Sequence, residues 1–464
     1  MSVACHAFGM TNENLVRRLG LIEAAAIVVG TIIGTGVFLK TAVMSQQAGS
    51  PTWVLMAWVV AGALSFAGAL TYAELGCLFP RAGGEYVYLR EAYGPLAGFL
   101  FGWTRFWIGS PGSIAAYGVG SATFLSGLVP IGGSKVAVAI SIITFFTLLN
   151  CLSVAFGGKL QAFMTGLKMA MILGLTIAIF FVADGTTWAN LATPEGAGFT
   201  NASMFGAAVL AALWAFDGWN NLPMAAGEIK DPGRILPKAL GLGMLAVLLL
   251  YGLANIAYFY ALPFTEVLTS SSSSHPDALP VATKAAQSAF GPTAVTFLSA
   301  AFIFSAVGAM NGSILTGARV PFAMARDGLF FRHLGEVNHK TRAPVAAVLV
   351  QGVWASVLAM SGTFDQLTDY VVFASWIFYA ACTASLFVFR KRMPTAQRSY
   401  KTPLYPVLPI VFLICSLLLL VNTLYTQPKY SLIGLGFILA GLPAYALFRR
   451  KGGIVTAAGG AAGK

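Results

Sequence analysis

The chain has 464 residues, of which 57% are hydrophobic and 9% are charged, whereas soluble domains carry roughly 25% charged residues. A soluble fold would leave a large apolar surface with nothing to cover it, so the composition excludes an ordinary soluble domain. The formal net charge of +12 would suit a nucleic-acid partner, but the distribution of the basic residues, given below, argues against nucleic acid.

Apolar runs near the length of a membrane span recur along the whole chain. A helix needs about 20 residues to cross the roughly 30 Å of hydrocarbon in a bilayer. The sequence holds about twelve such runs, approximately residues 20–44, 52–79, 95–125, 134–155, 160–183, 203–227, 239–261, 292–317, 344–361, 368–389, 404–422 and 431–448. It therefore predicts an all-α polytopic membrane protein with twelve transmembrane helices in a lipid bilayer.

The first run is interrupted by Gly34-Thr35-Gly36. A helix in lipid opens only where its freed peptide groups face protein or a cavity. Amides at the start of the second half-helix, with the Thr35 hydroxyl, would bind a carboxylate. The carbonyls of Ile32 and Ile33 would accept from an ammonium group. The alternative is a close packing contact between helices, which small residues also permit.

Three cations lie inside spans, namely Lys40, Arg105 and Lys168. Arg105, in the third run, is expected to pair with a carboxylate at a helix end. Lys168, in the fifth run, is expected to replace a bound cation or to carry a proton, since charged groups within a span usually mark ion or proton sites. The alternative for Lys168 is a side chain that reaches back toward the inner face, because Lys159 lies only nine positions earlier.

The sixth run is interrupted by the segment 214–220, which reads WAFDGWN. Asp217 lies in mid-span, where a charge costs roughly 2.5–3.5 kcal/mol on insertion scales. Carbonyls near Trp214 and Ala215 would take an ammonium group, with Asp217 adding negative charge or holding the turn at Gly218. Trp214 is placed to cover a ligand. The alternative is a structural aspartate, protonated or bonded to the backbone, among packing aromatics.

The two breaks fall in spans 1 and 6, which have opposite orientations in the membrane. Paired breaks of this kind indicate two five-helix units in inverted repeat, with helices 11 and 12 added. We expect a cytoplasmic segment at 1–19, a transmembrane 5+5 core at 20–390, helices 11–12 at 403–449 and a cytoplasmic, disordered tail at 450–464. Short helical pieces are expected in the outer loop 262–291, and an amphipathic segment in the inner loop 318–343.

The basic residues separate by side. With the N-terminus in the cytoplasm, 22 of the 28 lysines and arginines fall in inner segments. Three fall in outer segments, namely Lys135, Lys284 and Lys429. This is the positive-inside pattern, so the sequence predicts a multi-pass cell-membrane protein with both termini cytoplasmic and no nucleic-acid partner.

Cysteine and histidine positions argue against metal and enzyme chemistry. The five cysteines show no paired spacing, and the four histidines all lie outside the spans. Neither a disulfide framework nor an intramembrane metal site is predicted. No cofactor and no catalytic residue is expected. A channel should show a polar stripe or repeated filter carbonyls, and the sequence shows one asymmetric site instead.

Three blocks of sequence carry a resemblance to a known family. They read VGTIIGTGVF at 29–38, YAELG at 72–76 with PRAGGEY at 80–86, and AFDGWN at 215–220 with GEIKDP at 227–232. In this order and spacing they resemble the amino acid–polyamine–organocation superfamily, and within it the L-type amino acid transporter family. Thr35 stands where serine is commoner in that family, which keeps the hydroxyl.

The resemblance implies a LeuT-like fold that carries α-amino acids. Gly34, Thr35 and Gly36 would then hold the α-carboxylate, while Ile32, Trp214 and Asp217 would contact the α-amino group and Trp214 would act as a gate. Lys168 would lie where sodium-coupled relatives hold sodium, which argues against sodium dependence. Animal members pair with a glycoprotein through a cysteine in the loop after helix 3. The loop Ser126–Lys135 has none, so no disulfide-linked heavy subunit is expected.

The predicted function is secondary transport of amino acids by alternating access, as an exchanger of neutral L-amino acids. The alternatives are a proton-coupled symporter that uses Lys168, and an exchanger of cationic amino acids or polyamines. Asp217 does not separate these substrates, because relatives with this aspartate resemble carriers of both kinds.

Overall fold

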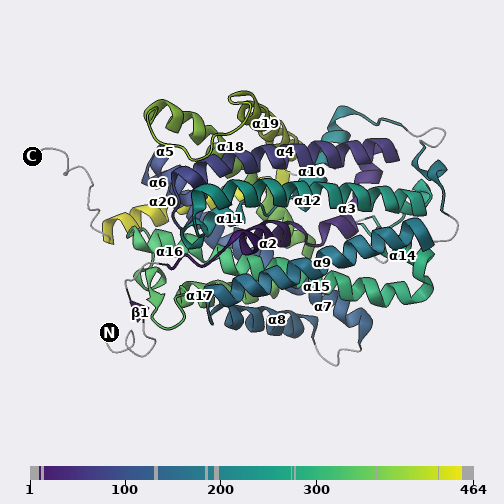
Figure 1. Cartoon of the computed structure of the whole chain (residues 1–464), viewed down its shortest axis with the longest axis horizontal. Coiled ribbons are helices and arrows are strands. Elements are labelled where there is room, and N and C mark those ends of the chain that lie inside the picture. The colour runs from purple at the N-terminus through teal and green to yellow at the C-terminus, as the bar shows by residue number, and fades with distance from the viewer. Residues whose placement is uncertain are drawn as a thin grey trace, which may run out of the picture.

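The structure is a computed structural model. It describes residues 10–11, 15–129, 134–182, 186–192, 198–272, 274–275, 278–361, 364–426 and 428–451. These residues are almost entirely helical. Figure 1 shows a bundle in which most long helices run along one axis, with the short α2 and α3 in its middle. A two-stranded antiparallel pairing, β1 (Met10–Thr11) with β2 (Val337–Asn338), lies at one end.

The longer helices follow the predicted apolar runs. They are α2 (Leu21–Ile32), α3 (Gly36–Ala48), α4 (Pro51–Leu78), α6 (Pro95–Thr104), α7 (Ser110–Leu128), α8 (Lys135–Asn150), α9 (Val154–Val182), α10 (Ala202–Ala215), α12 (Pro232–Ala261), α15 (Ala294–Gly317), α17 (Val345–Ala359), α18 (Phe364–Arg392), α19 (Val407–Thr426) and α20 (Pro428–Lys451). Among the described residues, eight helical segments are long and apolar enough to cross a membrane. The fold is therefore that of a polytopic membrane protein.

Short elements connect them. They are α5 (Glu85–Tyr93), the π-helix η1 (Arg105–Gly109), α11 (Asn221–Met224), α13 (Phe264–Leu268), α14 (Val281–Phe290), α16 (Arg319–Arg326) and the 3-10 turns η2 (Trp188–Leu191), η3 (Ala226–Glu228), η4 (Gly291–Thr293) and η5 (Arg332–Gly335). The helical pieces predicted in the loop 262–291 are present as α13 and α14, and the loop 318–343, where an amphipathic segment is predicted, contains α16. The predicted disordered tail lies almost wholly outside the described residues.

The sequence predicts one regular helix for the third apolar run, but the structure shows three helical elements there, α6, η1 and α7. Pro111, in the first turn of α7, has no backbone N–H to donate. The Ser110 amide bonds instead to the Arg105 carbonyl, five residues back, which gives the π-helix η1 between α6 and α7. The π-helix begins at Arg105 and so alters the direction in which this residue leaves the helix.

Local signals explain how the first span ends and the second begins. Gly49 takes a φ of 79° and donates its N–H to the Ser45 carbonyl, which closes α3 in a left-handed cap. Ser50 then accepts a hydrogen bond from the Trp53 amide, and Pro51 occupies the first turn of α4. The chain therefore reverses within three residues.

Burial separates a central group of helices from a peripheral one. The segment Leu21–Ala48 is 78% buried in its most apolar window, whereas the corresponding windows at the C-terminal end of the chain, in α19 and α20, are 28% and 17% buried. Helix α2 contacts α9, α12 and α15, and α3 contacts α10. The interrupted first span thus lies in the protein interior.

Candidate functional site

The two interruptions occur where the sequence predicts them and lie against each other. Residues 33–35 separate α2 from α3, and residues 216–220 separate α10 from α11. The Thr31 hydroxyl donates to the Gly218 carbonyl at 2.9 Å. Gly36 packs so closely on α10 that a Cβ there would lie 2.5 Å from the Ala215 Cβ. The breaks therefore form one structure rather than two separate kinks.

One detail of the second break differs from expectation. Trp214 and Ala215 still belong to the last turn of α10, and the Phe216 amide keeps its bond to the Ala212 carbonyl. The unwound part begins at Phe216, two residues later than expected, and contains Gly218 with a φ of 128°. The Trp214 carbonyl accepts from the Asp217 amide at 3.1 Å, so it is not an open acceptor.

Helix α12 contributes a hydroxyl that joins the breaks. The Tyr251 hydroxyl lies 3.1 Å from the Ile32 carbonyl and 3.2 Å from the Ala215 carbonyl. The hydroxyl can therefore donate to the carbonyl of the last residue of α2 or to that of the last residue of α10. Sequence analysis missed this residue, since nothing in the run 239–261 marks one tyrosine above the others.

Lys168 holds the first break from the opposite side. It is buried, and its Nζ donates to the carbonyls of Gly30, Ile33 and Ser305 at 2.9, 2.7 and 2.8 Å. It does not reach back along α9 toward Lys159. The ammonium group replaces the helical partners that the break removes, which is the geometry of a structural cation.

Ser305 of α15 completes this arrangement, and sequence analysis did not select it. Its hydroxyl lies 3.1 Å from the Ile33 carbonyl and 2.8 Å from the Gly34 carbonyl. The Ile33 carbonyl is therefore already occupied by Lys168 and Ser305. This differs from the expectation that it accepts from a ligand ammonium group.

A small cavity opens where the breaks meet. Its lining residues are Ile32, Gly34, Thr35, Gly36, Ser113, Ala116, Tyr117, Trp214, Ala215 and Asp217. Seven of these are among the nine residues predicted from sequence; Ile33 and Gly218 are not, and both make backbone contacts instead. The cavity volume of about 20 Å³ suits little more than a water molecule, so the site is closed in this structure.

The polar groups around this cavity are not all paired. The Thr35 hydroxyl is buried and has no hydrogen-bond partner among the described residues. The amides at the start of α3 have no partner in a preceding helical turn. Asp217 accepts a hydrogen bond from the Tyr379 hydroxyl at 2.6 Å. The cavity thus offers the unpaired Thr35 hydroxyl on one break and the Asp217 carboxylate on the other.

Trp214 borders the cavity and carries a cation on its other side. The Lys40 ammonium lies 4.6 Å from the centroid of the Trp214 ring, within the range of a cation–π interaction. This contact joins α3 to α10 just beyond the two breaks. It helps to keep the indole over the cavity in the closed arrangement.

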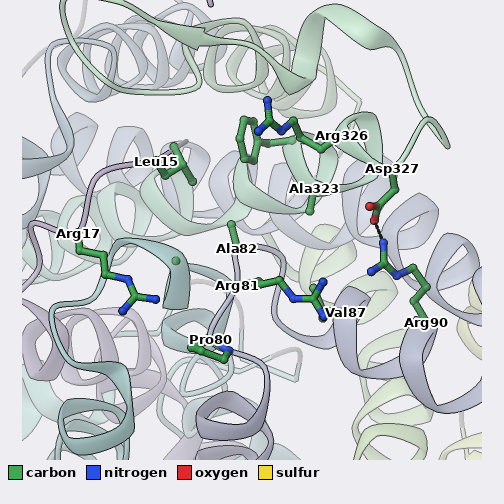
Figure 2. A pocket seen from close by; sticks show the side chains of 12 residues that line it. Leu15, Arg17, Pro80, Arg81, Ala82, Val87, Arg90, Ala323, Arg326 and Asp327 are labelled. Carbon is green, nitrogen blue, oxygen red and sulfur yellow. Dashed lines mark ion pairs between the residues drawn. The ribbon is translucent and has the colours of Figure 1, made fainter. Parts of the chain in front are cut away.

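A larger cavity of about 450 Å³ lies away from the breaks, at the end of the bundle that holds β1 and α16. Figure 2 shows Arg17, Arg81 and Arg326 around it and the ion pair between Arg90 and Asp327. Its basic lining and open position indicate an aqueous entrance rather than a closed binding site. Among the described residues, no group of three or more His, Cys, Asp or Glu side chains is arranged to hold a metal.

Comparisons with known proteins place the chain in a family. Residues 19–448 match the family model for amino acid permeases. The serine/threonine exchanger SteT of Bacillus subtilis (strain 168) is 34% identical over 439 residues, covering 94% of this chain and 98% of that protein. The b(0,+)-type amino acid transporter 1 of Mus musculus is 32% identical over 451 residues (96% and 90%). The human cystine/glutamate transporter is 30% identical over 450 residues (95% and 87%).

Proposed function

The chain belongs to the amino acid permease family, and from this premise we propose that it exchanges one amino acid for another across a membrane by alternating access. It is a transporter and not an enzyme. The observation that carries the proposed site is the cavity between the two interrupted helices, where the buried Thr35 hydroxyl lacks a partner among the described residues.

The proposed ligand is a zwitterion. Its carboxylate would accept from the amides at the start of α3 and from the Thr35 hydroxyl, where the helix dipole favours negative charge. Its ammonium group would lie near the Ile32 carbonyl and the Asp217 carboxylate. Trp214 would cover it on the side of Lys40. Lys168 already supplies the positive charge behind the first break, so we propose that exchange needs no sodium.

We propose neutral L-amino acids as substrates. The cavity wall on α7 is formed by Ser113, Ala116 and Tyr117, none of which is charged. A basic side chain would need a second anion beyond Asp217, and the described lining holds none. Exchange of cationic amino acids or polyamines and proton-coupled symport are the alternatives that the assay below separates.

The proposed topology has twelve spans in a 5+5 inverted repeat, with α19 and α20 added outside and both termini cytoplasmic. Figure 1 supports an even number of spans, since β1 and the C-terminal end of α20 lie at the same end of the bundle. The cell membrane is the proposed location. Because the loop Ser126–Lys135 carries no cysteine, we propose that the protein works without a disulfide-linked second subunit.

A counterflow assay tests the function. Purified protein in sodium-free liposomes should take up labelled serine or leucine only when the lumen contains unlabelled amino acid. Vesicles without protein are the control. Uptake into empty vesicles that follows an imposed pH gradient would identify a symporter and refute obligatory exchange. A preference for lysine or putrescine would refute the neutral specificity.

The Thr35 hydroxyl is tested by Thr35→Val, which keeps the volume and removes the donor. Loss of one hydrogen bond to a charged group costs about 1.5–3 kcal/mol, so the variant should bind the stabilising amino acid at least roughly tenfold more weakly. Thermal shift measures this, since a ligand at a hundredfold excess over its Kd stabilises by about 2.7 kcal/mol. Thr123→Val, at an exposed threonine of α7, is the matched control. An unchanged Kd in Thr35→Val would remove the carboxylate assignment.

A further inference from the structure

A buried carboxylate outside the proposed ligand site begins helix α5. Glu85 is 0% exposed. Its Oε1 accepts one hydrogen bond, from the Asn220 side chain at 3.1 Å, and its Oε2 has no partner among the described residues. A buried ionised carboxylate normally needs a cation or several donors. Glu85 has one neutral donor, so the charged form is poorly supported.

Among the described residues, one cation and several titratable groups face Glu85, and none of the charged ones is bonded to it. The groups that face it come from α4, α5, η1, the second break and α18, and are Tyr72, Tyr88, Arg105, Asn220, Asp217, Tyr379 and Cys382. Arg105 is the cation in this set, and its Nη2 donates to the Asn221 side chain at 2.7 Å. The expected pairing of Arg105 with a carboxylate is therefore not found in the part of the chain that the structure describes, where its Nε also has no partner.

Burial raises the pKa of the Glu85 carboxyl from 4.5 to about 7. The Arg105 guanidinium, the Asn220 amide and the Tyr72 hydroxyl lower this pKa without offsetting burial, and the Asp217 carboxylate raises it further. In this closed arrangement Glu85 thus changes charge near neutral pH. In water the Glu85 carboxyl would change charge near its ordinary pKa of 4.5.

Helix α5 joins two parts of the bundle. At its start, the Gly83 amide donates to the Met224 carbonyl at 2.9 Å, and a Cβ on Gly84 would lie 2.9 Å from the Met224 nitrogen. Farther along α5, Arg90 pairs with Asp327, which follows α16 (Figure 2). Asp327 also accepts from the Tyr86 hydroxyl at 2.7 Å. Helix α5 therefore closes the end of the bundle that is cytoplasmic in the proposed topology.

The cavity that forms the inner aqueous entrance lies close to this contact. The cavity of about 450 Å³ is lined by Ala82 and Val87, which flank the start of α5, and by Gly227 from the segment after α11. The two chain segments that form the Gly83–Met224 contact therefore also form part of the cavity wall. Separation of α5 from α11 would expose Glu85 to this water.

We propose that Glu85 is a proton-binding residue of the inner gate: it holds a proton while α5 is closed on α11, and it releases that proton into the adjacent cavity when the inner end opens. This inference rests on the proposed alternating access. The proton enters and leaves on the same side, so it is not transported with the substrate and the protein remains an exchanger.

The pH dependence follows from linkage. In the open form the Glu85 carboxyl regains a pKa near 4.5, against about 7 when closed. The proton therefore favours closure at low pH, and this advantage is lost as pH rises toward 7. Between these values the ratio of open to closed protein should rise up to about tenfold per pH unit, and it should level off above about 7.

Counterflow in liposomes at equal internal and external pH, from 5.5 to 8, tests the proposal. Wild-type exchange should fall as pH drops below about 7. Glu85→Gln, which mimics the protonated form, should give a slow rate that does not change with pH. Glu91→Gln removes an accessible carboxylate from the same helix and should keep the wild-type profile. A wild-type pH profile in Glu85→Gln would overturn the proposal.

Arg105→Gln provides a second test if Glu85→Gln does not fold. It removes a charge that lowers the pKa of Glu85, so the midpoint of the pH profile should move upward. An unchanged midpoint would contradict the inference.

Hydrogen exchange separates failure of the proposal from failure of the proposed function. Peptides containing Gly83 should lose protection as pH rises to about 7, after correction for the intrinsic exchange rate, and this requires no substrate. Protection independent of pH in a protein that still exchanges amino acids would refute only the role of Glu85. The expected protection change in a protein that exchanges no amino acid would refute only the transport function.

Discussion

Replacement of Lys168 by methionine is expected to reduce amino acid exchange by at least about a hundredfold. The Lys168 ammonium satisfies the carbonyls of Gly30 and Ile33 in the first break and that of Ser305 in α15. Each hydrogen bond to a charged group is worth about 1.5–3 kcal/mol, and methionine restores none of them. The break would then rearrange. Each loss of about 1.4 kcal/mol in the stability of the transport-competent conformation lowers its population about tenfold.

The control for this prediction lies on the same helix. Lys159 is exposed on α9, near the start of that helix, so Lys159→Met should exchange at close to the wild-type rate. Both variants are compared by counterflow after equal reconstitution, and by thermal unfolding to confirm that each folds. Exchange at the wild-type rate in Lys168→Met would mean that the ammonium group is dispensable and that the break is held by other contacts.

Gly218→Ala is expected to abolish exchange and to lower thermal stability. Gly218 has a φ of 128°, where a side chain is strained, and a Cβ there would lie 2.8 Å from the Thr31 carbonyl carbon and oxygen. These are backbone atoms of the other broken helix and cannot turn aside. Backbone strain alone costs of order 1–3 kcal/mol, and the clash would also separate the two breaks.

Gly252→Ala is the matched comparison. Gly252 lies in α12, where a Cβ would have no neighbouring atom within 4 Å among the described residues, and alanine is the better helix former by about 0.5–1 kcal/mol. This variant should therefore retain exchange and show an unchanged or higher melting temperature. If Gly218→Ala also kept exchange and stability, the close contact between the breaks would not matter for transport.

The positions of the two breaks could be predicted because their residues conflict with a spanning helix. Gly34-Thr35-Gly36 combines two glycines without side-chain packing, and Asp217 places a carboxylate in an apolar run, so each is unfavourable unless the backbone opens there. Lys168 could be selected for the same reason. The residue at which each helix ends beside its break could not be predicted. Trp214 and Ala215, for example, remain in the last turn of α10, although their sequence also suits an open turn.

The partners of the breaks could not be predicted. Tyr251, Ser305 and Tyr379 come from α12, α15 and α18, and their hydroxyls reach the site only through the packing of helices distant in sequence. Tyrosine and serine are common in these runs, and nothing local distinguishes the residue that faces inward. The same limit applies to Arg105, whose direction depends on the π-helix that Pro111 imposes.

A structure determined with a stabilising amino acid bound, in a lipid nanodisc, tests the central claim most directly. The account predicts that the ligand's α-carboxylate lies within hydrogen-bond distance of the Thr35 hydroxyl and the first amides of α3, with its ammonium group beside Asp217. An amino acid bound elsewhere, with the cavity between the two breaks still closed and its amides unengaged, would contradict it.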